Sequence, residues 1–176
     1  MKRPKGRGWI VCAGIVLAGG AVVVAGAGRA IGGDREVESI VASIDRTQSD
    51  TELRDHLEQL RALGNAASRR ALEEIASGDR KMPAILAAHT IARDGYDGAH
   101  AALQRIFENA QADRAVRTAA GQGLLRLQRA AGVSAADSER YFDARTGTDT
   151  RLATSIRATR AAYYPEPTVD TREGGK

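Results

Sequence analysis

The fold is decided by residues 71–75, ALEEI, which recur as ALQRI at residues 102–106, 31 positions further along the chain. The same offset backward reaches IVASI at residues 40–44, so three segments share one apolar spacing. Apolar residues three and four apart are typical of amphipathic helices, and from residue 36 onward no segment alternates with the two-residue period of a strand. The sequence therefore predicts an all-α protein built from a repeated helical unit.

Each of these segments is followed by a second helical pattern, which completes a hairpin. At an offset of 63, Asp50 and Arg54 align with Asp113 and Arg117, and residues 84–91 form the middle copy. The two aspartates precede apolar helical positions, so their side chains are expected to accept hydrogen bonds from first-turn amides. A single hairpin hides only part of its apolar face, and stacking of neighbouring hairpins is expected to cover the rest.

Residues 113–120, DRAVRTAA, followed by Leu124, resemble the second-helix signature of HEAT-like (armadillo-type) repeats, in which an Asp precedes an apolar residue, an Arg and paired alanines. The middle unit departs from this pattern, with Ile85 in place of the Arg and Pro83 near the helix start. The resemblance covers about residues 36–131. It implies an α-solenoid of about three HEAT-like helical hairpins, and it implies an architecture rather than an activity.

The predicted repeats span residues 35–131. The regions on either side of them differ from the repeats in composition. Residues 132–164 hold two further helical patterns, begun by Ser134 and Asp149, and are expected to form capping helices at the C-terminal end of the stack. Residues 165–176 are almost without apolar side chains and are expected to be a disordered tail.

The N-terminal region carries a membrane signal. Residues 10–27 contain no charged side chain, and four cations precede them within the first seven residues. Residues 1–9 are therefore expected to stay cytoplasmic, with residues 10–30 as a transmembrane anchor or signal peptide and the repeats outside the cytoplasm. The length of the stretch favours an anchor. Residues 25–27, AGA, match a cleavage site, so an exported soluble form cleaved near Ala27 is the alternative.

The charge balance argues against a nucleic-acid partner. The formal net charge of +4 comes entirely from Lys2, Arg3, Lys5 and Arg7, and the remaining chain is neutral. Nucleic-acid binding requires basic side chains concentrated on one face, and no such concentration is evident in the sequence. The single cysteine, Cys12, lies in the apolar stretch, so no internal disulfide is expected in the folded part.

The residues that could carry chemistry do not form a recognised motif. His89 and His100 flank Asp94 and Asp97, but two histidines 11 positions apart fit no usual metal-ligand spacing. The glycines between them indicate a tight turn. The predicted exported part has no cysteine, and its serines lack a glycine-rich elbow. We therefore expect no catalytic residue, no metal and no cofactor.

The expected function is that of a scaffold, because stacked helical hairpins present a groove formed by their second helices, which holds peptides or protein domains. The partner is expected to be an extracytoplasmic protein or peptide, met by a chain that residues 10–30 attach to the membrane. Candidate contacts are the polar positions Arg54, Gln59, His89, Arg93, Arg117 and Gln122. Alternatively, Arg54 and Arg117 tie repeats together through Asp50 and Asp113. A HEAT-like lyase or enzyme-maturation factor and a membrane-bound regulator are the other functions that stay open.

Overall fold

A computed structural model describes residues 20–165 of the chain, with side chains from Gly33 onward. Within that range the chain forms eight helices and no strand, which confirms the predicted all-α class. The helices are α1 (Gly20–Arg46), α2 (Asp50–Leu63), α3 (Ala66–Ser77), α4 (Lys81–Asp94), α5 (Ala99–Glu108), α6 (Arg114–Ala130), α7 (Ala135–Thr146) and α8 (Thr150–Tyr163).

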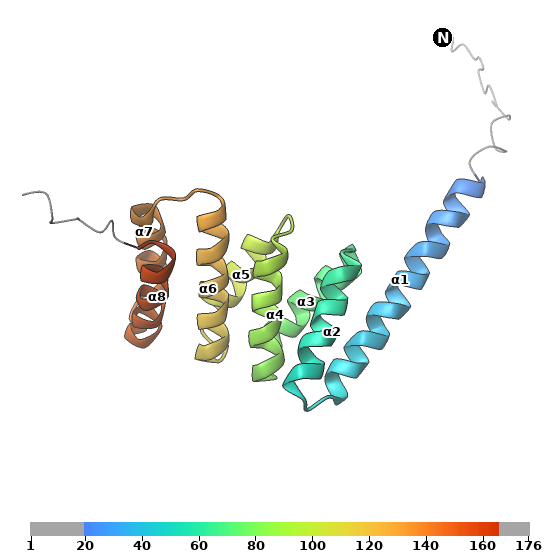
Figure 1. Ribbon diagram of the computed structural model, residues 1–176, viewed down its shortest axis with the longest axis horizontal. Coiled ribbons are helices and arrows are strands. Elements are labelled where there is room, and N and C mark those ends of the chain that lie inside the picture. Colours follow the sequence, from blue (N-terminus) through green and yellow to red (C-terminus); the bar gives the residue numbers. More distant parts are fainter. Residues whose placement is uncertain (1–19, 166–176) are drawn as a thin grey trace, which may run out of the picture.

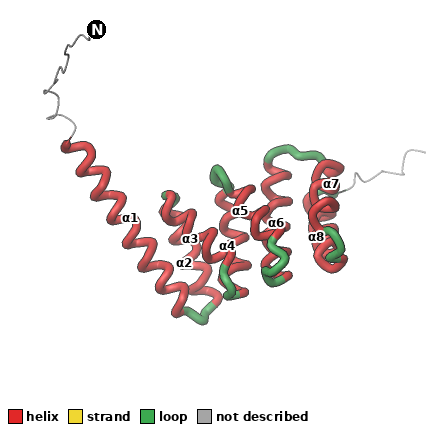
Figure 2. Tube along the Cα trace, turned by 180° about the vertical axis from the view of Figure 1, so that it is seen from behind, coloured by secondary structure: helices red, strands yellow, loops and turns green. Residues whose placement is uncertain are grey.

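Consecutive helices pair as hairpins that follow one another along the long axis of the molecule (Figure 1). The second helices form one row, in which α2 contacts α4, α4 contacts α6, and α6 contacts α8. The first helices form another row, in which α3 contacts both α1 and α5. Short loops connect the helices (Figure 2). The predicted capping region, residues 132–164, is itself a hairpin of α7 and α8, and α8 extends the row of second helices.

The first helix begins earlier than the repeat pattern, which starts at residue 36. It is continuous from Gly20, and its N-terminal part diverges from the other helices (Figure 1). The C-terminal part of α1 packs on α2 and α3, and its buried apolar residues, Val37, Ile40 and Ile44, are spaced three and four apart. The C-terminal part of α1 therefore belongs to the stack.

Much of the predicted membrane segment lies outside the described residues. This holds for its residues 10–19, for the predicted cytoplasmic residues 1–9 and for residues 166–176 of the predicted tail. Among the helices of residues 20–165, none has the combination of length and apolar character that crossing a membrane requires.

Side-chain caps begin several of the helices. The confirmed N-caps are Asp113, Ser134 and Asp149, each of which accepts a hydrogen bond from a first-turn amide. The prediction for Asp50 was wrong. Ser49 caps α2 by accepting from the amide of Glu52 at 3.4 Å, and Asp50 is the first helical residue. The two adjacent residues can both cap a helix, and the carboxylate in the first turn still stabilises the helix dipole.

The packing around α6 is close, and two of its glycines leave no space for a side chain. A Cβ atom at Gly121 would clash with Ile156 of α8. A Cβ atom at Gly123 would lie 2.9 Å from Cβ of Ala92 in α4 and 2.9 Å from Cδ1 of Leu103 in α5. These distances are shorter than van der Waals contact, so the glycines set how closely α6 approaches its neighbours.

We expect Gly123→Ala to lower the free energy of unfolding by about 1–2 kcal/mol, because overpacking outweighs the gain in helix propensity. Urea unfolding of the full-length protein, followed by circular dichroism, measures the change. The matched control is Gly33→Ala in α1, which meets only the amide nitrogen of the Asn65 side chain, at 3.3 Å, and should be neutral or stabilising. Equal stability of Gly123→Ala and wild type would contradict the close approach of α4 and α6.

Candidate functional site

A groove of about 700 Å³ runs across the row of second helices. We call it the second-helix groove and define it by its lining residues. These are Arg54, Asp55, Leu57 and Glu58 of α2; Leu86, His89, Thr90, Ala92 and Arg93 of α4; Gln122, Gly123 and Arg126 of α6; and Thr159 and Tyr163 of α8. An adjoining hollow shares His89 and Gln122 and continues to the starts of α4 and α6, at Lys81, Asp113 and Arg114.

The structure brings together four of the six candidate contacts, Arg54, His89, Arg93 and Gln122, in the second-helix groove. Gln59 is exposed on α2 and is not a lining residue, and Arg117 also lies outside the lining.

Other lining residues, notably Arg126 and Tyr163, were not predicted from the sequence. Arg126 follows Gln122 by four positions in α6, so helical spacing places both on one face and could have identified it. Tyr163 carried no such signal, because α8 lies outside the three segments that align in sequence.

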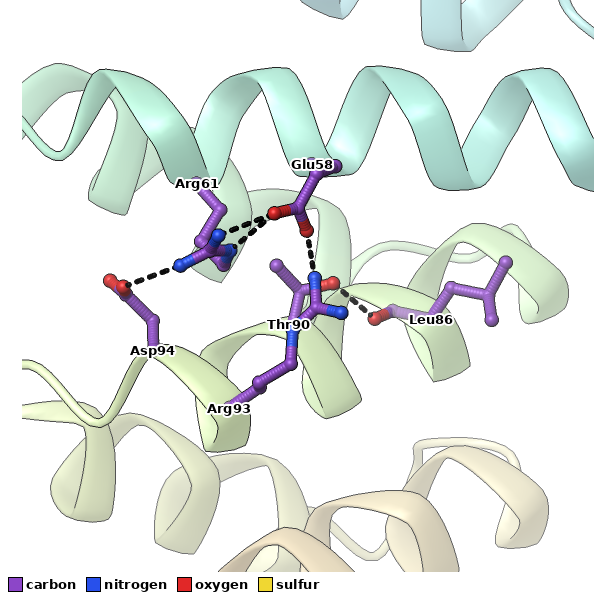
Figure 3. A network of polar contacts seen from close by, with 6 residues as sticks. All are labelled: Glu58, Arg61, Leu86, Thr90, Arg93 and Asp94. Carbon is purple, nitrogen blue, oxygen red and sulfur yellow. Dashed lines mark hydrogen bonds and ion pairs between the residues drawn. The ribbon is translucent and has the colours of Figure 1, made fainter.

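The floor of the groove is apolar and made of closely packed residues. It consists of Leu57, Leu86, Ala92 and Gly123, all of which are buried. Thr90 is also buried, and its hydroxyl donates to the carbonyl oxygen of Leu86 at 2.9 Å, as Figure 3 shows. This hydroxyl donor is satisfied within α4. Polar recognition in the groove therefore depends on the side chains along its rim.

Glu58 is the centre of an ion-pair network that joins α2 to α4 (Figure 3). Its carboxylate accepts from Nε of Arg61 at 2.8 Å and also pairs with Arg93 across the helix boundary. Arg61 in turn lies 3.8 Å from the carboxylate of Asp94. Glu58 and Arg93, which both line the groove, therefore neutralise each other.

Other charged rim residues have no such match. Arg54 and Arg126 are exposed, and neither side chain makes an ion pair or hydrogen bond within residues 33–165. The same holds for Arg114 in the adjoining hollow and for the carboxylate of Asp55. Within the described residues, the second-helix groove and the adjoining hollow are therefore lined by three arginines without a partner and by one carboxylate without a partner. This surface is positively charged.

Arg117 holds two neighbouring hairpins together. Its Nε donates to the carbonyl oxygen of Phe107 at 3.0 Å, at the end of α5, and its Nη1 donates to the carboxylate of Asp149 at 3.1 Å. Only 12% of its side chain is exposed. The sequence left open whether Arg117 contacts a partner or ties repeats together. In the structure it ties two hairpins together, and its carboxylate partner is Asp149 instead of Asp113. Asp113 instead pairs with Lys81, at 3.4 Å.

The two histidines that flank the predicted turn have different surroundings. Desolvation in the groove lowers the pKa of His89 below 6.5, and the positive charge of Arg54 lowers it further. The ring is therefore uncharged at neutral pH and offers one hydrogen-bond donor and one acceptor. The His100 ring packs edge-on against Tyr141 of α7, with ring centroids 5.9 Å apart. In the part of the chain that the structure describes, no three His, Cys, Asp or Glu residues gather as a metal site.

Comparison with protein-family models, with curated proteins and with solved structures finds no match. The resemblance to HEAT-like repeats thus stays a prediction from the residues that carry it.

We expect Arg117→Ala to lower the free energy of unfolding by about 1.5–3 kcal/mol, because it removes charged hydrogen bonds to Phe107 and Asp149. Arg54→Ala is the matched control, since the two positions align in sequence, and its effect should stay within about 0.5 kcal/mol. Urea unfolding of both variants measures the difference. Equal losses would mean that Arg54 is also a structural tie.

We expect the His89 imidazole to titrate below pH 6.5, and Arg54→Gln to move its midpoint upward. The unfolded chain protonates His89 at higher pH than the folded chain does. The neutral His89 ring therefore contributes to the free energy of unfolding above pH 6.5, and this contribution is lost as the pH falls through the pKa of the folded state. NMR titration with His89→Gln for assignment measures both midpoints. A wild-type midpoint at or above 6.5 would show that the ring is not desolvated.

Proposed function

We propose that this chain is a HEAT-like repeat scaffold that binds an extended peptide or protein segment in the second-helix groove. The observation that carries the proposal is a continuous groove from α2 to α8, with an apolar floor and a rim of polar side chains. Apolar surface supplies affinity in such sites, and a few polar groups fix the orientation of the occupant.

The solenoid assignment is part of the proposal. Its support is the repeated hairpin, the row of contacts α2 to α4 to α6 to α8, and the DRAVRTAA segment at the start of α6. In such stacks each unit contacts its neighbours alone, which produces an elongated surface rather than a closed pocket.

The dimensions of the groove suit an extended occupant. Packed helices lie about 10 Å apart, so the three steps from α2 to α8 cover about 30 Å. An extended chain advances about 3.3 Å per residue, which corresponds to about nine residues. A short segment of a larger protein can therefore contact all four second helices.

Selection from a library of random peptides tests this proposal with purified full-length protein. We expect binders that are lost on the double substitution Arg54→Ala and Gln122→Ala and kept on Arg151→Ala, an exposed position of α8 outside the groove. Circular dichroism of each variant checks that the helices are intact. If no binder depends on the groove residues, peptide binding at this site is wrong.

We also propose that the repeats lie outside the cytoplasm, either tethered through residues 10–30 or released by cleavage near Ala27. The support is the charge asymmetry around the apolar stretch. A reporter that is active only after export, fused after Lys176, should be active in cells. An intact N-terminus on the membrane-extracted protein favours the anchor. Activity of a cytoplasmic reporter at the same position instead would reverse the orientation.

A further inference from the structure

We infer that the occupant of the second-helix groove is an acidic segment, whose Asp or Glu side chains pair with Arg54 and Arg126. This inference rests on the proposed function, since it names the chemistry of the peptide that the groove binds. It starts from the two exposed arginines, which lie on different helices of the same groove.

The network within the groove determines which charges are available to a ligand. Glu58 is engaged by Arg61 and Arg93, so it cannot also neutralise a further cation at full strength. Arg54 on α2 and Arg126 on α6 are left without a carboxylate in the described part of the chain. They stand on the helices to either side of α4, so one ligand that crosses α4 can reach both.

The residue type of these cations favours carboxylates. An arginine guanidinium donates two parallel hydrogen bonds to one carboxylate, and this geometry is both stronger and more directional than a neutral hydrogen bond. Arg114 extends the same charge into the adjoining hollow, which shares His89 and Gln122 with the groove. A longer acidic segment could therefore follow the surface toward the start of α6.

The groove is less suited to a polyanion such as nucleic acid. Asp55 lies in the lining beside Arg54, and the carboxylate of Glu58 lines the groove as well. Nucleic acid places one phosphate charge after another along its backbone and requires a row of cations without intervening acids. A peptide can separate its acidic side chains with small neutral ones, which suits a floor that contains Ala92 and Gly123.

Fluorescence anisotropy with the full-length protein and a labelled peptide of about nine alternating Glu and Ser residues tests the inference. The Gln and Ser peptide of equal length is the neutral probe. We expect the acidic probe alone to bind, and its affinity to fall about tenfold on Arg54→Glu with Arg126→Glu, because two ion pairs become repulsive. The affinity should also weaken as salt rises from about 50 to about 300 mM.

The charge-matched control is Arg35→Glu with Arg151→Glu. Both arginines are exposed, lie outside the groove and make no side-chain ion pair within the described residues. This variant changes the net charge by the same amount and should keep the affinity of wild type. If the groove variant does not fold, as judged by circular dichroism, Arg54→Gln with Arg126→Gln replaces it, with a smaller loss expected.

Three results would overturn the inference. The first is equal binding of the Gln and Ser peptide, and the second is tighter binding of a single-stranded oligonucleotide of equal charge. The third is self-association, detected by light scattering, that the groove variant abolishes. This last result would make a second copy of the chain the occupant. The library selection separates this failure from that of the proposed function. Groove-dependent peptides without acidic enrichment would leave the peptide-binding scaffold standing and remove the acidic specificity alone.

Discussion

The close approach of α6 to its neighbours is the constraint on which the rest of the structure depends. Gly123 brings α6 against Ala92 of α4, and the fully buried Ala88 and Ala120 add further small residues to these two helices. Helices packed this closely have little freedom to slide, because any displacement brings backbone and Cβ atoms into collision. The backbone positions from which the rim residues of α4 and α6 project are therefore fixed relative to each other.

The row of second helices separates the stabilising residues from those available for binding. Apolar and small side chains face inward, and the groove floor is the outer surface of that same packing. Mutating the floor would alter the stack, whereas the exposed Arg54 and Arg126 can change with little effect on packing. The chemistry of the rim can therefore vary while the repeat architecture is retained, which is how a common fold acquires different partners.

The sequence predicted the helices because their apolar spacing is local information. It predicted none of the ion pairs that the structure shows between separate helices, since each depends on how those helices pack. Glu58 and Arg93 are 35 positions apart, and no local pattern sets their register. The groove was predicted only in part, because it also depends on how the hairpins pack. Arg54, His89, Arg93 and Gln122 were predicted from the second-helix pattern, but Tyr163 of α8 was not. Both a groove contact and a tie between repeats stayed open for Arg117, because a binding arginine and a structural one look alike in sequence.

The different roles of Arg54 and Arg117 follow from what stands at the start of the next second helix. Arg117 finds the carboxylate of Asp149, which caps α8. The equivalent position for Arg54 is the start of α4, where the cap residue is Arg80, a cation with no side-chain capping bond. Arg80 instead donates to the carbonyl oxygen of Ile44 at 2.8 Å, at the end of α1. The departure of the middle unit from the repeat pattern thus leaves Arg54 without a structural partner, and its charge remains available in the groove.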